Sequence, residues 1–183
     1  MKKILVLLLL TACCLRAQSE KIDLGSRGQL TLYVPETLKV STSDFGDRHI
    51  VTIEPAGEGN ASCTLTITFP ETDRFDTKAR LAMQVEVSGA KFAEQSVEGK
   101  ARAKEFSLTT GYGFYCNFTD PELVGKPPQK GNFKTISAGL IRLAPDVLIE
   151  VGISADGFAS EPYQQMLGMI EGMEFKASGK RSS

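Results

Sequence analysis

The sequence predicts an α+β fold in which a mainly antiparallel central sheet is flanked by two main helices. Several short segments alternate apolar and polar residues, as strands do when successive side chains point to opposite faces. A segment in mid-chain and another near the C-terminus instead carry apolar residues at helical spacing. With 183 residues, 42% of them hydrophobic and 23% charged, the chain can bury a core without metal staples.

The first half of the chain predicts four strands. In residues 30–34 apolar and polar side chains alternate, and Pro35 ends the run. Strands over residues 38–42 and 49–53 follow. The clearest is residues 62–69, where four apolar side chains face one way and three threonines the other.

The segment from Asp76 to Phe92 carries both strand and helix periodicity. We expect a helix here, because good helix formers follow a capping Asp76 and because Gly89 can end the helix.

The second half predicts a sheet and a final helix. Strands are expected over residues 104–109 and 112–119, and a hairpin over 132–154 with its tip at 143–146. Ser160 is expected to cap the last helix. Its predicted buried stripe is Tyr163, Met166, Leu167, Ile170 and Met173.

The N-terminus has the order of a bacterial secretory signal. Lys2 and Lys3 precede an apolar run over residues 4–10, which is shorter than the roughly 20 residues of a membrane-spanning helix. Cleavage after Ala17 would make residues 1–17 the signal and release a soluble protein. Residues 10–13 also look like a lipobox, which would limit the signal to residues 1–12 and lipidate Cys13. Either cut places the protein outside the cytoplasm, in the periplasm, secreted, or anchored as a lipoprotein.

The remainder is expected to form one α+β domain over residues 18–175, followed by a disordered tail over 176–183, which is small, polar and basic. Without the three basic residues of the signal, 18 basic residues face 22 acidic ones, a net charge near −4. This charge argues against a nucleic-acid surface. Contact with a membrane is expected only through a lipid anchor.

Cys63 and Cys116 are the cysteines that remain after cleavage at Ala17. An oxidising compartment permits a disulfide between them. Both lie on apolar faces of predicted strands, so two buried free thiols are the alternative.

The sequence offers no constellation of catalytic residues. His49 is the single histidine, and no G-x-S-x-G motif supplies a nucleophile for a triad through it. The cysteines are expected to be buried and unreactive. No clustered Cys and His predict a zinc site, and no glycine-rich phosphate loop is present, so neither metal nor cofactor is expected.

The order of elements resembles the PsbP-like superfamily, which includes a photosystem II extrinsic subunit, a Ran-binding import factor and bacterial exported proteins. The likeness is carried by LTLYVP (30–35), ASCTLTITF (61–69), LTTGYGFYCNFTD (108–120), the long hairpin, and ADGFASEPYQQMLGMIEGMEF (155–175). It covers most of the mature chain as a pattern, without the tryptophan that usually follows the opening proline. The resemblance implies an α/β/α sandwich and a role in binding or assembly without catalysis.

These observations favour a non-enzymatic binding or assembly module of the bacterial cell envelope, which docks on a protein or a membrane complex. The predicted partner surface is the loop over residues 120–131, with Lys126, Pro127 and Pro128, and the aromatic residues Tyr112 and Tyr115, expected to lie near it. The alternatives are a carrier of a small ligand or lipid, in a cleft between the sheet and a helix, and a hydrolase centred on His49.

Overall fold

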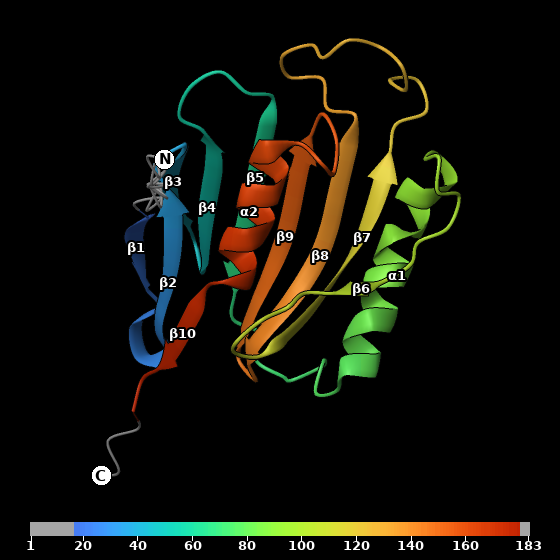
Figure 1. Cartoon of the computed structure of the whole chain (residues 1–183). Helices are drawn as coiled ribbons and strands as arrows, with labels where there is room; N and C mark the ends of the chain where they lie inside the picture. The colour runs from blue at the N-terminus through green and yellow to red at the C-terminus, as the bar shows by residue number, and fades with distance from the viewer. Residues whose placement is uncertain (1–16, 180–183) are drawn as a thin grey trace, which may run out of the picture.

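The computed structural model describes residues 17–179, and its α+β architecture agrees with the class expected from the sequence. A seven-stranded antiparallel sheet has the order β3-β4-β5-β9-β8-β7-β6, and a three-stranded sheet has the order β1-β2-β10 (Figure 1). The large sheet comprises β3 (Leu38–Phe45), β4 (Arg48–Pro55), β5 (Ala61–Thr68), β6 (Lys104–Glu105), β7 (Tyr112–Thr119), β8 (Thr135–Ala144) and β9 (Val147–Ala155). The small sheet comprises β1 (Ala17–Asp23), β2 (Gly28–Pro35) and β10 (Glu174–Ala177), and the helices are α1 (Lys78–Glu94) and α2 (Glu161–Glu171).

The large sheet separates two hydrophobic cores, one on each face. On the first face, α2 and β2 pack over β4, β5 and β9, and this core includes the fully buried Leu30, Leu65 and Ile149. On the second face, α1 packs over β7 and β8 and buries Leu81 and Val85. We call these the α2 face and the α1 face. Alternation along each strand assigns its side chains to one face or the other.

The segment with mixed periodicity forms a helix, α1, as expected, but both of its predicted ends were wrong. Thr77, not Asp76, is the N-cap, and its side-chain oxygen accepts the Arg80 N–H at 3.3 Å. The Asp76 carboxylate instead pairs with the Arg80 guanidinium at 2.8 Å. Gly89 lies inside the helix, which continues to Glu94.

Two further boundaries differ from the prediction. The strand expected over 104–109 is limited to Lys104–Glu105, because the chain then turns to bury Phe106 against the ring of Tyr115. Lys176 and Ala177, which were expected to lie in the disordered tail, instead belong to β10, which pairs with β2 and places Lys176 opposite Gln29.

Helix α2 has the predicted cap residue and most of the predicted stripe. Ser160 is the N-cap, although its hydroxyl donates to the Gly157 carbonyl and not to a helix N–H. Leu167, predicted to belong to the buried stripe, is only half-buried, and Met169 is buried although it was not predicted.

Candidate binding groove beside helix α1

The floor of a groove is formed by alternate residues of β8 on the α1 face. Ile136, Ala138 and Leu140 lie in a row along this strand, and Leu148 of β9 lies beside them. Ile136 retains 36% of its surface exposed. The cover provided by α1 therefore leaves apolar side chains of the sheet open to the outside.

The wall of the groove is one side of α1. Gln84, Ser88 and Phe92 follow one another at four-residue spacing and line it. Phe92 is 51% exposed and lies 5.6 Å, between ring centroids, from Phe118 of β7. Gly89 allows the helix to approach the sheet, since a Cβ atom there would lie 2.9 Å from Cζ of Phe118.

Two cavities follow this wall, with volumes of about 410 Å³ and 490 Å³. The first holds the floor residues Ala138, Leu140 and Leu148, and the second holds Ile136 and Phe118. Both are lined by Phe92, so they adjoin. Each falls within the roughly 300–1,000 Å³ of sites that bind small molecules in proteins. Together they form what we call the α1 groove.

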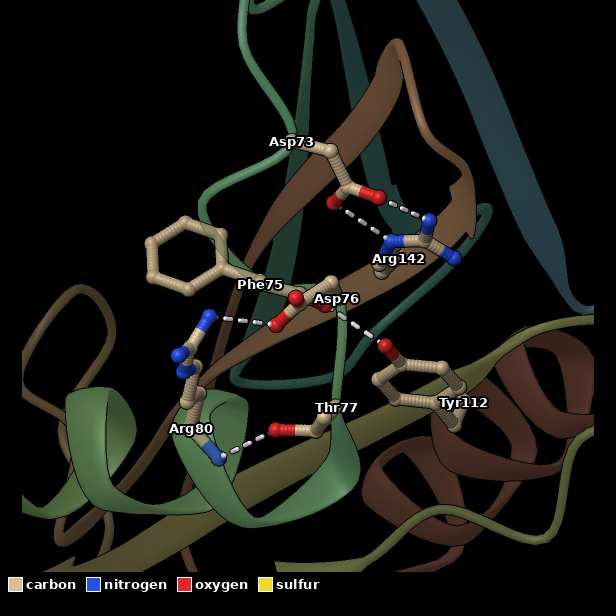
Figure 2. Close-up of polar contacts among 7 residues, drawn as sticks. All are labelled: Asp73, Phe75, Asp76, Thr77, Arg80, Tyr112 and Arg142. Atoms are coloured by element: carbon tan, nitrogen blue, oxygen red, sulfur yellow. Dashed lines mark hydrogen bonds and ion pairs between the residues drawn. The ribbon is translucent and has the colours of Figure 1, made fainter.

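One end of the α1 groove is closed by the segment that leads into α1. Figure 2 shows the Asp73 carboxylate facing the guanidinium of Arg142 from β8, with Nε to Oδ1 at 2.9 Å and a second contact from Nη2 to Oδ2. The Tyr112 hydroxyl donates to the Phe75 carbonyl at 2.5 Å. The ring of Phe75 points away from Tyr112 and Arg142 (Figure 2) and lines the first cavity.

The Asp73–Arg142 contact also sets the charge of both groups. The hydrogen bond from Arg142 lowers the pKa of the Asp73 carboxyl, and the same bond raises the pKa of the guanidinium. Arg142 further lies 5.5 Å from the centroid of the Tyr112 ring. This cation is therefore neutralised within the protein.

The other end of the α1 groove opens at the segment between β7 and β8, which rises beyond the sheet in Figure 1. The loop over residues 120–131 is ordered by Asn60, which immediately precedes β5. The Asn60 amide nitrogen donates to the carbonyls of Gln129 and Asn132, both at 3.1 Å. Its oxygen accepts the Gly131 N–H at 2.8 Å. A third cavity of about 410 Å³ lies within this loop.

The structure separates the predicted partner-surface residues into two groups. Lys126, Pro127 and Pro128 line the loop cavity together. Tyr112 and Tyr115 do not lie near the loop, and that prediction was wrong. Tyr112 begins β7 at the end remote from the loop, roughly 23 Å along the strand. Tyr115 belongs to the α2 face, where its ring packs 4.5 Å from Phe106.

Cys63 and Cys116 are both buried and free, so the disulfide left open by the sequence is not formed. Cys63 lies on the α2 face of β5 and Cys116 on the α1 face of β7. Two strands lie between them, a separation of roughly 14 Å that no disulfide spans. Burial raises the pKa of Cys63 to about 12, and it also raises that of Cys116.

His49 lies far from the α1 groove, on the α2 face at the margin of β4. Its Nδ1 lies 2.6 Å from Oδ1 of Asp44, and its ring meets Phe69 edge-on. His49 lines a cavity of about 180 Å³. Among the described residues that line this cavity, Thr42 is the one with a hydroxyl group. No hydrogen bond in residues 17–179 joins His49 to a hydroxyl group. The imidazole and the Asp44 carboxylate are thus paired, and no hydroxyl group of the described residues is hydrogen-bonded to the imidazole.

Within residues 17–179, no group of three or more His, Cys, Asp or Glu side chains could hold a metal ion. No helix in the same range is long and apolar enough to cross a membrane. The lipobox cysteine Cys13 and the signal up to Arg16 lie outside the described residues.

Comparisons with models of known protein families, with curated proteins and with solved structures found no match. The site is therefore interpreted from its own geometry. A cleft between the sheet and a helix was only an alternative at the level of the sequence, and none of its residues was named. The alternation of Ile136, Ala138 and Leu140 was available, yet apolar Ile141 and Leu143 on the opposite face obscured it.

Proposed function

We propose that this protein is an exported, non-enzymatic binding module of the bacterial cell envelope, and that the α1 groove holds an apolar ligand. The observation that carries the proposal is the row Ile136, Ala138 and Leu140, left open beside a helix that presents Phe92 to the same space. Apolar surface gathered in a concave site is typical of a ligand site. Filling this space would remove the exposed apolar area from water.

The test fills the groove from the helix side. Ser88→Phe places a ring between α1 and the floor, while the neighbouring Val87 is 65% exposed and lines neither cavity. Val87→Phe is therefore a matched control of the same size on the same helix. The mature protein is purified from its native envelope and examined by native mass spectrometry for retained apolar molecules.

We expect wild type and Val87→Phe to retain the ligand and Ser88→Phe to lose it, with equal melting temperatures. Equal retention by all three proteins would contradict the groove as the site. No retained ligand, and no binding of added alkyl compounds by folded wild type, would contradict the function itself.

A second candidate function is docking of a partner protein on the loop over residues 120–131. It is favoured by the hydrogen bonds of Asn60, which order a loop that carries a concave surface lined by Lys126, Pro127 and Pro128. Replacing residues 121–130 with a short Gly-Ser linker should abolish cross-linking to the partner in cells without unfolding the domain. Unchanged cross-linking would reject the loop as the docking surface.

We also propose that the fold is a PsbP-like sandwich. A helix on each face of a mainly antiparallel sheet supports this relationship. The relationship also requires that PsbP-like proteins contain a sheet equivalent to the three-stranded sheet β1-β2-β10. Superposition of an experimental structure on PsbP-like proteins, strand order included, tests it.

A further inference from the structure

We propose that the α1 groove takes a free single-chain amphiphile with an anionic head group, and that Lys134 contacts the head. This inference rests on the proposed function and adds the chemistry of the ligand. Its basis is the position of Lys134, which immediately precedes β8 and lines the second cavity together with Ile136. A cation thus stands at the open end of an apolar row.

The apolar part of the groove suits one alkyl chain. From Thr135 to Leu140 the floor spans roughly 17 Å of extended strand. Lys134 immediately precedes this strand, so the path is close to the length of a hexadecyl chain. Apolar side chains run the length of this path, among them Phe133, Phe118, Phe92 and Leu148. Polar side chains of the second cavity, such as Gln95, Ser96 and Thr119, gather at the open end. Phe75 closes the far end, so a chain that enters beside Lys134 ends against an aromatic ring.

A peptide fits this groove less well than an alkyl chain. The floor is the face of a sheet, not its edge, so its backbone groups are already paired between strands. Polar partners on the lining of the first cavity are limited to the side chains of Gln84, Ser88 and Glu150. Gln84 already donates to Ser88 at 3.0 Å. In the first cavity a bound peptide would bury more N–H and C=O groups than these side chains could pair, whereas an alkyl chain has no such groups to satisfy.

Arg142 of β8 and Lys134, which immediately precedes β8, differ in their partners. Arg142, near the closed end, is paired with Asp73. Lys134 has no carboxylate within 4.0 Å among residues 17–179. Asp120 and Glu122 also line the mouth, and the Asp120 carboxylate accepts the Glu122 N–H at 2.8 Å.

The chain segment that includes the mouth carries a small positive excess, although two carboxylates and one lysine line the second cavity itself. Residues 120–134 contain three lysines against two carboxylates, in a chain of net charge −1. Lys134 also lines the loop cavity with Lys126, so two ammonium groups adjoin the entrance. An anionic head at this position would gain charge-assisted hydrogen bonds to an otherwise unpaired lysine.

The experiment distinguishes the contribution of the anionic head group to binding from that of the alkyl chain. Delipidated mature protein is titrated calorimetrically with hexadecanoate and with hexadecan-1-ol, each at monomeric concentrations. Lys134→Met removes the charge and keeps an unbranched side chain. Lys100→Met is the control, because Lys100 is exposed and lines neither cavity of the groove.

We expect Lys134→Met to weaken hexadecanoate binding about tenfold and to leave hexadecan-1-ol binding unchanged, with Lys100→Met equal to wild type for both. Equal effects on both ligands, or none on hexadecanoate, would overturn the role of Lys134 while leaving the groove as an apolar site. Binding of neither ligand by folded wild type would overturn the proposed function as well. Capture by anionic phospholipid vesicles without binding of monomeric hexadecanoate would reject a free amphiphile in favour of a membrane surface.

Discussion

The Asp73 carboxylate pairs with the Arg142 guanidinium through two hydrogen bonds and so ties the segment before α1 to β8. Arg142 belongs to the same row of β8 as Leu140, and Asp73 is two residues from Phe75. The pair therefore fixes the closed end of the α1 groove relative to its floor. The side chain of Arg142 is only 16% exposed, which limits competition by water.

The first prediction concerns the pH dependence of this pair. Because Arg142 lowers the pKa of Asp73, folding favours the charged carboxylate. The resulting stabilisation is complete above the ordinary aspartate pKa of about 3.9 and is lost as the pH falls through the lower folded value. Asp73→Asn should therefore lower the urea midpoint at neutral pH, and the difference from wild type should close in acid. No difference at pH 7, or a difference that grows as the pH falls, would show that the pair is not formed.

A second prediction concerns Asn60 and the loop that it orders. Asn60→Ala removes the donors to Gln129 and Asn132 and the acceptor of the Gly131 N–H. We expect a loss of about 1–3 kcal/mol in stability. Trypsin should also cleave faster after Lys130, whereas Lys126 is protected because Pro127 follows it. Cleavage is followed by mass spectrometry under native conditions, and an unchanged rate at Lys130 would argue against the tether.

A third prediction contrasts two glycines in helices. Gly89→Val should destabilise the protein by about 2 kcal/mol, because its Cβ would lie 2.9 Å from Phe118 and 3.2 Å from Ala101. A Cβ atom added at Gly168 of α2 would instead meet no atom within 4 Å. Gly168→Ala should therefore stabilise the protein by up to about 1 kcal/mol. Chemical denaturation measures both, and a tolerated Gly89→Val would mean that α1 does not approach the sheet so closely.

The cysteines provide a fourth prediction. The folded mature domain should show no mass change on reduction, because Cys63 and Cys116 are free and lie on opposite faces. Cys63 should resist iodoacetamide at pH 8, since burial keeps its pKa near 12 and the thiol protonated. Both thiols should become reactive in guanidinium chloride. A two-hydrogen increase on reduction, assigned to these residues, would contradict the strand order.

Much of the fold was predictable because alternation marks strands that are buried on one face. Residues 62–69 show this clearly, since three of the four predicted inward positions, Cys63, Leu65 and Ile67, are fully buried. The fourth, Phe69, follows the end of β5 and is half-buried. Strand β1 was missed because Ile22 is its one large apolar residue, and β10 was missed because only Phe175 marks it. Their pairing with β2 depends on tertiary contacts that local patterns do not encode.

The site was harder to predict than the fold. Helix α1 carries apolar residues on more than one side, with Met83 60% and Val87 65% exposed, so its periodicity did not indicate a groove. The role of Asn60 depends on partners about seventy residues away in the sequence. The hydrogen bond between Tyr112 and Phe75 likewise joins distant segments. Such contacts arise from the folded arrangement and leave no local signal.

The most direct test of the α1 groove is methyl NMR of the mature protein during titration with hexadecanoate. The account predicts that the methyl signals of Ile136, Leu140 and Leu148 shift together and saturably, because these side chains line the cavities. Ile141 and Leu65, buried on the α2 face, should remain in place. Shifts confined to the α2 face, or a spectrum unchanged at saturating ligand, would contradict the central claim.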